Sequence, residues 1–224
     1  MNILLENLSI VIIAKDFNVS IFKPFWLIKN NIFHEEELQG NIVITPPAVQ
    51  IPAQDFQFTV LPDRLQMVIP RRYPNAEADI ARIVKQTVKT LPHTPYTAVG
   101  LNFNYLVAPK SEDAFSAWNR SLFASPLASK LQLPKDENAR FGSYVSFDVL
   151  GTRLKIDIRP VKAAPNIENL CKFWHVGQDL IRINFNFHSD VANMASPADS
   201  VLDKLGKWGE ALTLSQKLTE MISE

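Results

Sequence analysis

Leu101-Asn-Phe-Asn-Tyr105 is the stretch that decides the fold, together with its near copy Ile183-Asn-Phe-Asn-Phe187. Apolar and polar residues alternate in both stretches, which is the period of a β-strand with one buried face and one open face. We therefore predict strands over 97–107 and 180–188. The same order of residues in both also indicates a repeated unit.

A pair of hairpins supports the repeat. Phe58-Thr-Val-Leu-Pro-Asp-Arg-Leu-Gln-Met-Val-Ile69 aligns without gaps on Phe147-Asp-Val-Leu-Gly-Thr-Arg-Leu-Lys-Ile-Asp-Ile158, with turns expected at Pro62-Asp63 and Gly151-Thr152. Each hairpin precedes one of the Asn-Phe-Asn strands, and a helix is predicted after each strand. This order predicts an internal duplication, with units at 56–123 and 144–222 and a linker at 124–141. Convergence of two amphipathic hairpins on similar residues is the alternative.

The helices are predicted from caps and from apolar spacing. Asn75 is expected to cap a helix that ends before Pro92, and Ser111 one that turns Phe115, Trp118 and Leu122 inward. Ser196-Pro-Ala-Asp199 is typical of a helix start, and we expect that helix to reach the C-terminus. It would place an apolar stripe against the core, made of Val201, Leu205, Trp208 and Leu212.

The N-terminal third reads as further strands, at 9–14, 25–28, 41–45 and 56–60. The fold class that follows is α+β, as a single domain over 1–224. We predict two layers, with a curved antiparallel sheet of about seven to nine strands and helices on one face, including a long C-terminal helix.

Composition limits the function classes. The 224 residues include 23 basic and 23 acidic ones, and this zero net charge disfavours a dedicated nucleic-acid binder. It also permits self-association, so a homodimer through the C-terminal helix or an unpaired edge strand is expected. The single cysteine, Cys171, favours a cytoplasmic location, and no apolar run is long enough for a membrane span.

Signatures of common enzymes and metal proteins are absent from the sequence. No glycine-rich phosphate loop and no G-x-S-x-G elbow occurs, and His34, His93, His175 and His188 form no metal-binding array. Cys171 and His175 could share a helix face, but a structural role is the simpler interpretation. The acidic run after His34 is interpreted as a solvated surface. We therefore expect no cofactor and no metal.

One candidate site follows from the strand alternation. If Leu101, Phe103 and Tyr105 face the core, the residues between them face the other way, and asparagine there suits recognition of amides, bases or sugars because it both donates and accepts hydrogen bonds. If the two Asn-Phe-Asn strands are neighbours, their outward residues form one polar patch. Its predicted members are Asn102, Asn104, Arg182, Asn184, Asn186 and His188.

The leading hypothesis is a non-enzymatic binding or interaction protein of a bacterium or its virus. It would use this open sheet face, or an apolar groove beneath the C-terminal helix, for a small ligand or a protein partner. One alternative is a hydrolase with dispersed catalytic residues around His175 or His188 as base. Another is a nucleic-acid binder that uses the sheet face. That alternative requires clustering of basic residues, namely Arg64, Arg71, Arg72, Arg153, Lys155, Arg159 and Arg182.

Overall fold

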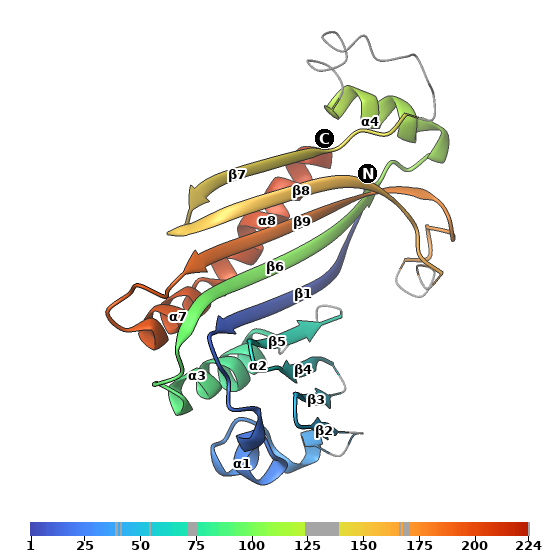
Figure 1. Ribbon diagram of the computed structural model, residues 1–224. Coiled ribbons are helices and arrows are strands. Elements are labelled where there is room, and N and C mark those ends of the chain that lie inside the picture. The colour runs from blue at the N-terminus through green and yellow to red at the C-terminus, as the bar shows by residue number, and fades with distance from the viewer. Residues whose placement is uncertain are drawn as a thin grey trace.

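The computed structural model describes every residue except 39, 41, 54, 71–75, 124–138, 166, 168–170 and 224. In this part of the chain, nine strands form one antiparallel sheet in the order β2-β3-β4-β5-β1-β6-β9-β8-β7 (Figure 1). The strands are β1 (Asn2–Ala14), β2 (Val43–Thr45), β3 (Ala48–Pro52), β4 (Gln57–Val60), β5 (Arg64–Ile69), β6 (Tyr96–Ala108), β7 (Ser143–Val149), β8 (Thr152–Lys162) and β9 (Asp179–Asp190).

Helices complete the α+β fold that the sequence predicts. The α-helices are α1 (Pro24–Lys29), α2 (Ala76–Asp79), α3 (Gln86–Thr90), α4 (Phe115–Phe123), α7 (Pro197–Gly206) and α8 (Trp208–Ser223). Shorter helical segments are the 3₁₀ turns η1 (Val19–Ile21), η2 (Glu35–Leu38) and η4 (Glu112–Ala114) and the π-helical η3 (Ile80–Lys85). None of the described helices is long and apolar enough to cross a membrane.

The core lies between the centre of the sheet and helices α7 and α8. The ring of Phe103 on β6 packs against Trp208 with centroids 4.7 Å apart, and the hydroxyls of Tyr105 and Ser215 lie 2.9 Å apart. The predicted apolar stripe of Val201, Leu205, Trp208 and Leu212 is buried, as expected. The predicted single helix is interrupted at Lys207, which follows Gly206 and separates α7 from α8.

Three local predictions are wrong. Residues 25–28 form helix α1 rather than a strand, and Pro24 occupies its first position, where a missing N–H is harmless. Leu122 is 37% exposed instead of facing inward. The second hairpin turns at Leu150-Gly151, both with positive φ, and not at Gly151-Thr152.

The helix predicted after Asn75 exists as the continuous run of α2, η3 and α3. Its proposed cap, Asn75, and most of the predicted linker lie outside the described residues. Arg82 in this run binds Glu37 and Asp79, so part of the acidic run after His34 is half-buried and ion-paired rather than simply solvated. Burial lowers the pKa of Arg82, but the hydrogen bonds that Arg82 donates to these two carboxylates, together with their negative charge, outweigh it and raise that pKa overall.

The two predicted repeat units connect their strands differently. β5 and β6 are both antiparallel to β1, which lies between them, so they run parallel to each other. β8 and β9, the corresponding strands of the second unit, are direct antiparallel neighbours. The structure therefore does not confirm the duplication, and the duplication and the sheet curvature stay predictions.

Candidate functional site

The six residues predicted from the alternation lie together on two neighbouring central strands. β6 and β9 pair directly, with Asn102 opposite Asn186 and Asn104 opposite Asn184. Opposite side chains in such a pair stand about 5 Å apart at Cβ, on the same face. The register also brings Arg182 and His188 onto this face, opposite Leu106 and Gly100. We call this set the polar strip: Asn102, Asn104, Arg182, Asn184, Asn186 and His188.

Hydrogen bonds extend the polar strip onto the strands at either side. The Asn104 amide donates to Asn7 Oδ1 on β1 at 2.7 Å, and the Asn184 amide donates to Asp157 Oδ2 on β8 at 3.3 Å. The Asn102 amide lies 3.5 Å from the Ser9 carbonyl. The amides are thereby held in fixed orientations, which is what a recognition surface requires.

Asn186 differs from the other three asparagines. Its Oδ1 is buried and accepts no hydrogen bond within the described part of the chain. The atom lies over Gly100, where an added Cβ would approach it to 3.3 Å. Most buried polar atoms are hydrogen-bonded, so an unpartnered acceptor in the middle of the polar strip is unusual.

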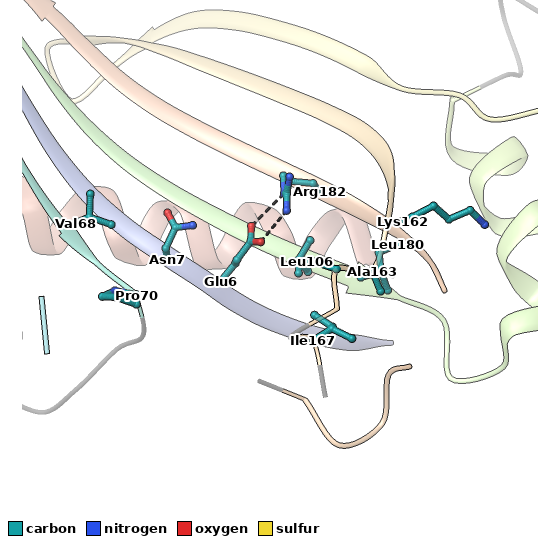
Figure 2. A pocket seen from close by; sticks show the side chains of 11 residues that line it. Glu6, Asn7, Val68, Pro70, Leu106, Lys162, Ala163, Ile167, Leu180 and Arg182 are labelled. Carbon is teal, nitrogen blue, oxygen red and sulfur yellow. Dashed lines mark hydrogen bonds and ion pairs between the residues drawn. The ribbon is translucent and has the colours of Figure 1, made fainter. Parts of the chain in front are cut away.

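At one end of the polar strip, Arg182 forms a bidentate ion pair with Glu6. Arg182 donates through Nε at 3.0 Å and through Nη2 at 2.7 Å, and Figure 2 shows the two side chains pointing toward each other. The pairing of β1 with β6 shifts register between Leu5 and Asn7, so Glu6 is the extra residue of a β-bulge. Sequence reasoning missed Glu6 because a bulge leaves no clear mark on the alternation.

A pocket of about 280 Å³ lies beside this ion pair (Figure 2). Its apolar lining includes Leu106, Ile167 and Leu180, which belong to a second small core together with Trp174. That core forms where described residues of 163–178 cover this end of the otherwise open face. Further lining residues are Glu6, Asn7, Val68, Pro70, Lys162, Ala163, Ala164 and Arg182.

At the other end, the His188 ring lies 3.1 Å from the Asp190 carboxylate. A second pocket, of about 420 Å³, adjoins them and is also lined by Arg153 and Lys204. The Asp190 side chain is 86% exposed, so water solvates it and weakens its influence on the imidazole. This geometry offers a carboxylate to His188, whose own side chain is only 28% exposed, but the carboxylate lies in solvent rather than in an enclosed site.

His175, the other histidine considered for catalysis, is exposed and lies in a segment of turns. The predicted helix face shared by Cys171 and His175 therefore does not exist, and Cys171 packs at the margin of the second small core. In the described residues, no group of three or more His, Cys, Asp or Glu side chains is placed to hold a metal ion.

Five of the seven basic residues named for the nucleic-acid alternative share the open face, but they are spread over β5, β8 and β9. The register places Arg64, Arg153, Lys155, Arg159 and Arg182 there, while Arg71 and Arg72 lie outside the described residues. The four arginines of this set each lie within 4 Å of a carboxylate. The pairs are Arg64 with Asp63, Arg153 with Asp148, Arg159 with Asp157, and Arg182 with Glu6. The positive charge is therefore largely compensated locally.

No known protein family, no curated protein and no solved structure matches the chain.

Proposed function

We propose that this chain is a non-enzymatic binding protein, and that it holds a small uncharged polar ligand in the pocket beside Arg182. The observation that carries the proposal is the mixed lining of that pocket. Leu106, Ile167 and Leu180 supply apolar surface, while Asn7 and the Glu6–Arg182 pair supply oriented polar groups. Ligand sites commonly combine an apolar lining with a few placed polar groups.

Charge and size narrow the ligand class. Arg182 is already neutralised by Glu6, and Lys162 at the same pocket is paired with Asp179 at 2.8 Å. An anionic ligand would meet the negative charge of Glu6 or Asp179 beside either cation, which disfavours its binding. A volume of about 280 Å³ is at the low end for ligand pockets. A small amide, a nucleobase or a monosaccharide fits both limits, and the neighbouring asparagines can donate and accept toward it.

The test is a titration of the isotope-labelled full chain with acetamide derivatives, free nucleobases and monosaccharides, followed by NMR. Binding should shift the Arg182 Nε–H signal and the side-chain amide signals of Asn7 and Asn104. The amide of Asn30, which donates to the carbonyl of Trp26 on helix α1, is the internal control and should not move. Signals that shift only at Asn30 and the surface around α1 would contradict the proposal.

A pocket-filling variant sharpens the result. Ala164 lines the pocket and is exposed, so Ala164→Trp should occupy the space without disturbing the core. The shifts should disappear in this variant and persist in Ala195→Trp, which enlarges a residue near α7. Turnover of any of these probes, lost on changing His188 or His175, would replace the binding proposal with the hydrolase alternative.

A further inference from the structure

Strand β7 ends the described sheet, and two of its apolar side chains, Val145 and Phe147, are partly exposed. Val145 and Phe147 point to the helix-covered side of the sheet, opposite Ile156 and Leu154 of β8. The two β8 residues are 5% and 0% exposed, whereas Val145 is 42% exposed and Phe147 39%. The helical layer therefore covers β8 but not β7, and apolar side chains stay partly exposed at this edge of the sheet.

Among the described residues, the outer edge of β7 also has little of the usual protection against pairing, and Asp148 is the one charged side chain of the strand. Natural edge strands are short or carry proline, lysine or bulges. β2, at the opposite edge, has three residues and is followed by Pro46-Pro47. β7 has seven residues, contains no proline or lysine, and pairs with β8 without a register shift. It is the edge at which another strand can be added.

The hairpin turn determines which backbone groups face that edge. Val149 and Thr152 close a two-residue turn, so they form a hydrogen-bonded pair. Hydrogen-bonded and non-hydrogen-bonded pairs alternate along an antiparallel ladder. The N–H and C=O groups of Tyr144, Ser146 and Asp148 therefore point away from β8, toward the free edge.

We propose that a second copy of this chain occupies this edge, pairing β7 with β7 antiparallel about a twofold axis through Ser146. This register joins all seven residues of each strand. It pairs Ser146 with its own copy and Tyr144 with Asp148 of the second copy, so the three outward-facing residues supply every hydrogen bond of the new ladder. The two sheets become one continuous sheet.

The side chains of β7 are self-complementary in this register. Val145 of each copy lies opposite Phe147 of the other, so four partly exposed apolar side chains bury one another on the helix-covered side. A register shifted by one residue would put Val145 and Phe147 of one copy on the same side as the polar face of the other copy. That shifted register is therefore disfavoured. Asp148 is already paired with Arg153, and the net charge of zero adds little repulsion between copies. These features match an isologous interface, in which one surface serves both partners.

A matched pair of lysine variants tests the proposal by analytical ultracentrifugation over a wide concentration range. The unmodified chain should sediment at twice 25.3 kDa and dissociate on dilution. Val145→Lys should be monomeric, because two lysines would enter the apolar cluster. Ile44→Lys changes a residue of similar exposure, 46%, on the other edge strand, and should leave the dimer intact.

Ser146→Pro provides a second variant that preserves the hairpin. Its missing N–H is one that points away from β8, so the ladder with β8 is retained and only the new ladder is blocked. We expect a monomer with an unchanged circular dichroism spectrum. A dimer that survives both Val145→Lys and Ser146→Pro, or an unmodified chain that is monomeric at every concentration, would overturn the proposal.

Cross-linking tests the register in a Cys171→Ser background. Ser146→Cys places the two thiols on the axis, where facing Cα atoms are about 5.5 Å apart, so a short bismaleimide should join the protomers. Ser143→Cys separates the two thiols by six residues along the strand, about 20 Å, and should not react across the interface. Cross-linking of Ser143→Cys in preference to Ser146→Cys would contradict the proposed axis.

Discussion

On the helix-covered face of β6 and β9, Phe103 packs against Trp208, and Tyr105 lies edge-on to Phe185. On the opposite face, one residue along the same strand, Asn104 donates to Asn7 and remains half-buried. Phe103 and Asn104 belong to the same strand and the same backbone ladder. Their different surroundings therefore come from their side chains and from what covers each face. The covered face is held by apolar burial, whereas the open face depends on individual polar contacts.

Alanine substitutions at the neighbouring residues Phe103 and Asn104 should show the largest difference between the two faces in lost free energy of unfolding. Phe103→Ala leaves a cavity under Trp208, and we expect it to lower the free energy of unfolding by about 4 kcal/mol. Asn104→Ala removes one hydrogen bond beside water, and should cost about 1 kcal/mol or less. Urea denaturation followed by circular dichroism measures both. Equal losses in the two variants would show that the open face contributes to stability as a second core.

A titratable group in the core gives the next largest effect. Tyr96 is 2% exposed, and its hydroxyl donates to the Leu91 carbonyl at 3.1 Å. Burial raises the pKa of Tyr96 to about 12, partly opposed by a hydrogen bond with Thr94. The folded chain thus favours the neutral phenol. Its contribution to stability is complete below about pH 10, where the unfolded chain also keeps the proton, and is lost as pH rises toward 12.

Tyr96→Phe isolates this contribution. Between pH 8 and about pH 11.5, the unmodified chain should lose about 2 kcal/mol more free energy of unfolding than the variant. The variant should start about 1 kcal/mol less stable at pH 8, because the Leu91 carbonyl loses one of its two hydrogen bonds and keeps only the one from the Thr94 N–H. Urea unfolding at several pH values provides the curves. Parallel curves for the two proteins would mean that the phenol ionises as easily folded as unfolded.

On the open face, the Glu6–Arg182 pair should show a smaller effect. The two side chains are 21% and 30% exposed, so water screens part of their attraction. A double-mutant cycle with Glu6→Gln and Arg182→Met should give a coupling of about 1 kcal/mol. The coupling should shrink at high salt, because the pair is partly solvated. A coupling that is unaffected by salt would mean that the pair is shielded from solvent, as the residues of the covered face are.

The sequence predicted the central strands well because their alternation has only one periodic interpretation. Leu101, Phe103 and Tyr105 had to share a face, which placed Asn102 and Asn104 on the other. Phe25-Trp-Leu-Ile28 lacks such a period, since a short apolar run fits a strand or a buried helix equally well. There the backbone restriction at Pro24 and the burial of Leu27 determined a helix.

The candidate site could be predicted only in part, for a related reason. The strand alternation identified Arg182, but its partner Glu6 is 176 residues away along the chain and sits in a bulge. The pocket also depends on Ala163, Ala164 and Ile167 lying over the open face, a contact between segments that no local pattern encodes. Likewise, Leu150 with a φ of 54° reflects the geometry of the hairpin rather than the preference of leucine.

The smallest expected effect concerns Gly100, which lies beneath the Asn186 amide on the open face. An added Cβ would lie 3.3 Å from Asn186 Oδ1 and 3.8 Å from Asn102 Nδ2, so Gly100→Ala must displace the Asn186 amide. We expect a loss of about 0.5 kcal/mol in the otherwise unmodified chain. In an Asn186→Ala background the crowding disappears, and the same change should gain about 0.5 kcal/mol, because alanine restricts the unfolded chain more than glycine does. This reversal of sign, measured by urea unfolding of the four proteins, would show that Gly100 is glycine to make room for the Asn186 amide. A loss of equal size in both backgrounds would mean that it is the backbone at Gly100, and not the amide above it, that requires glycine.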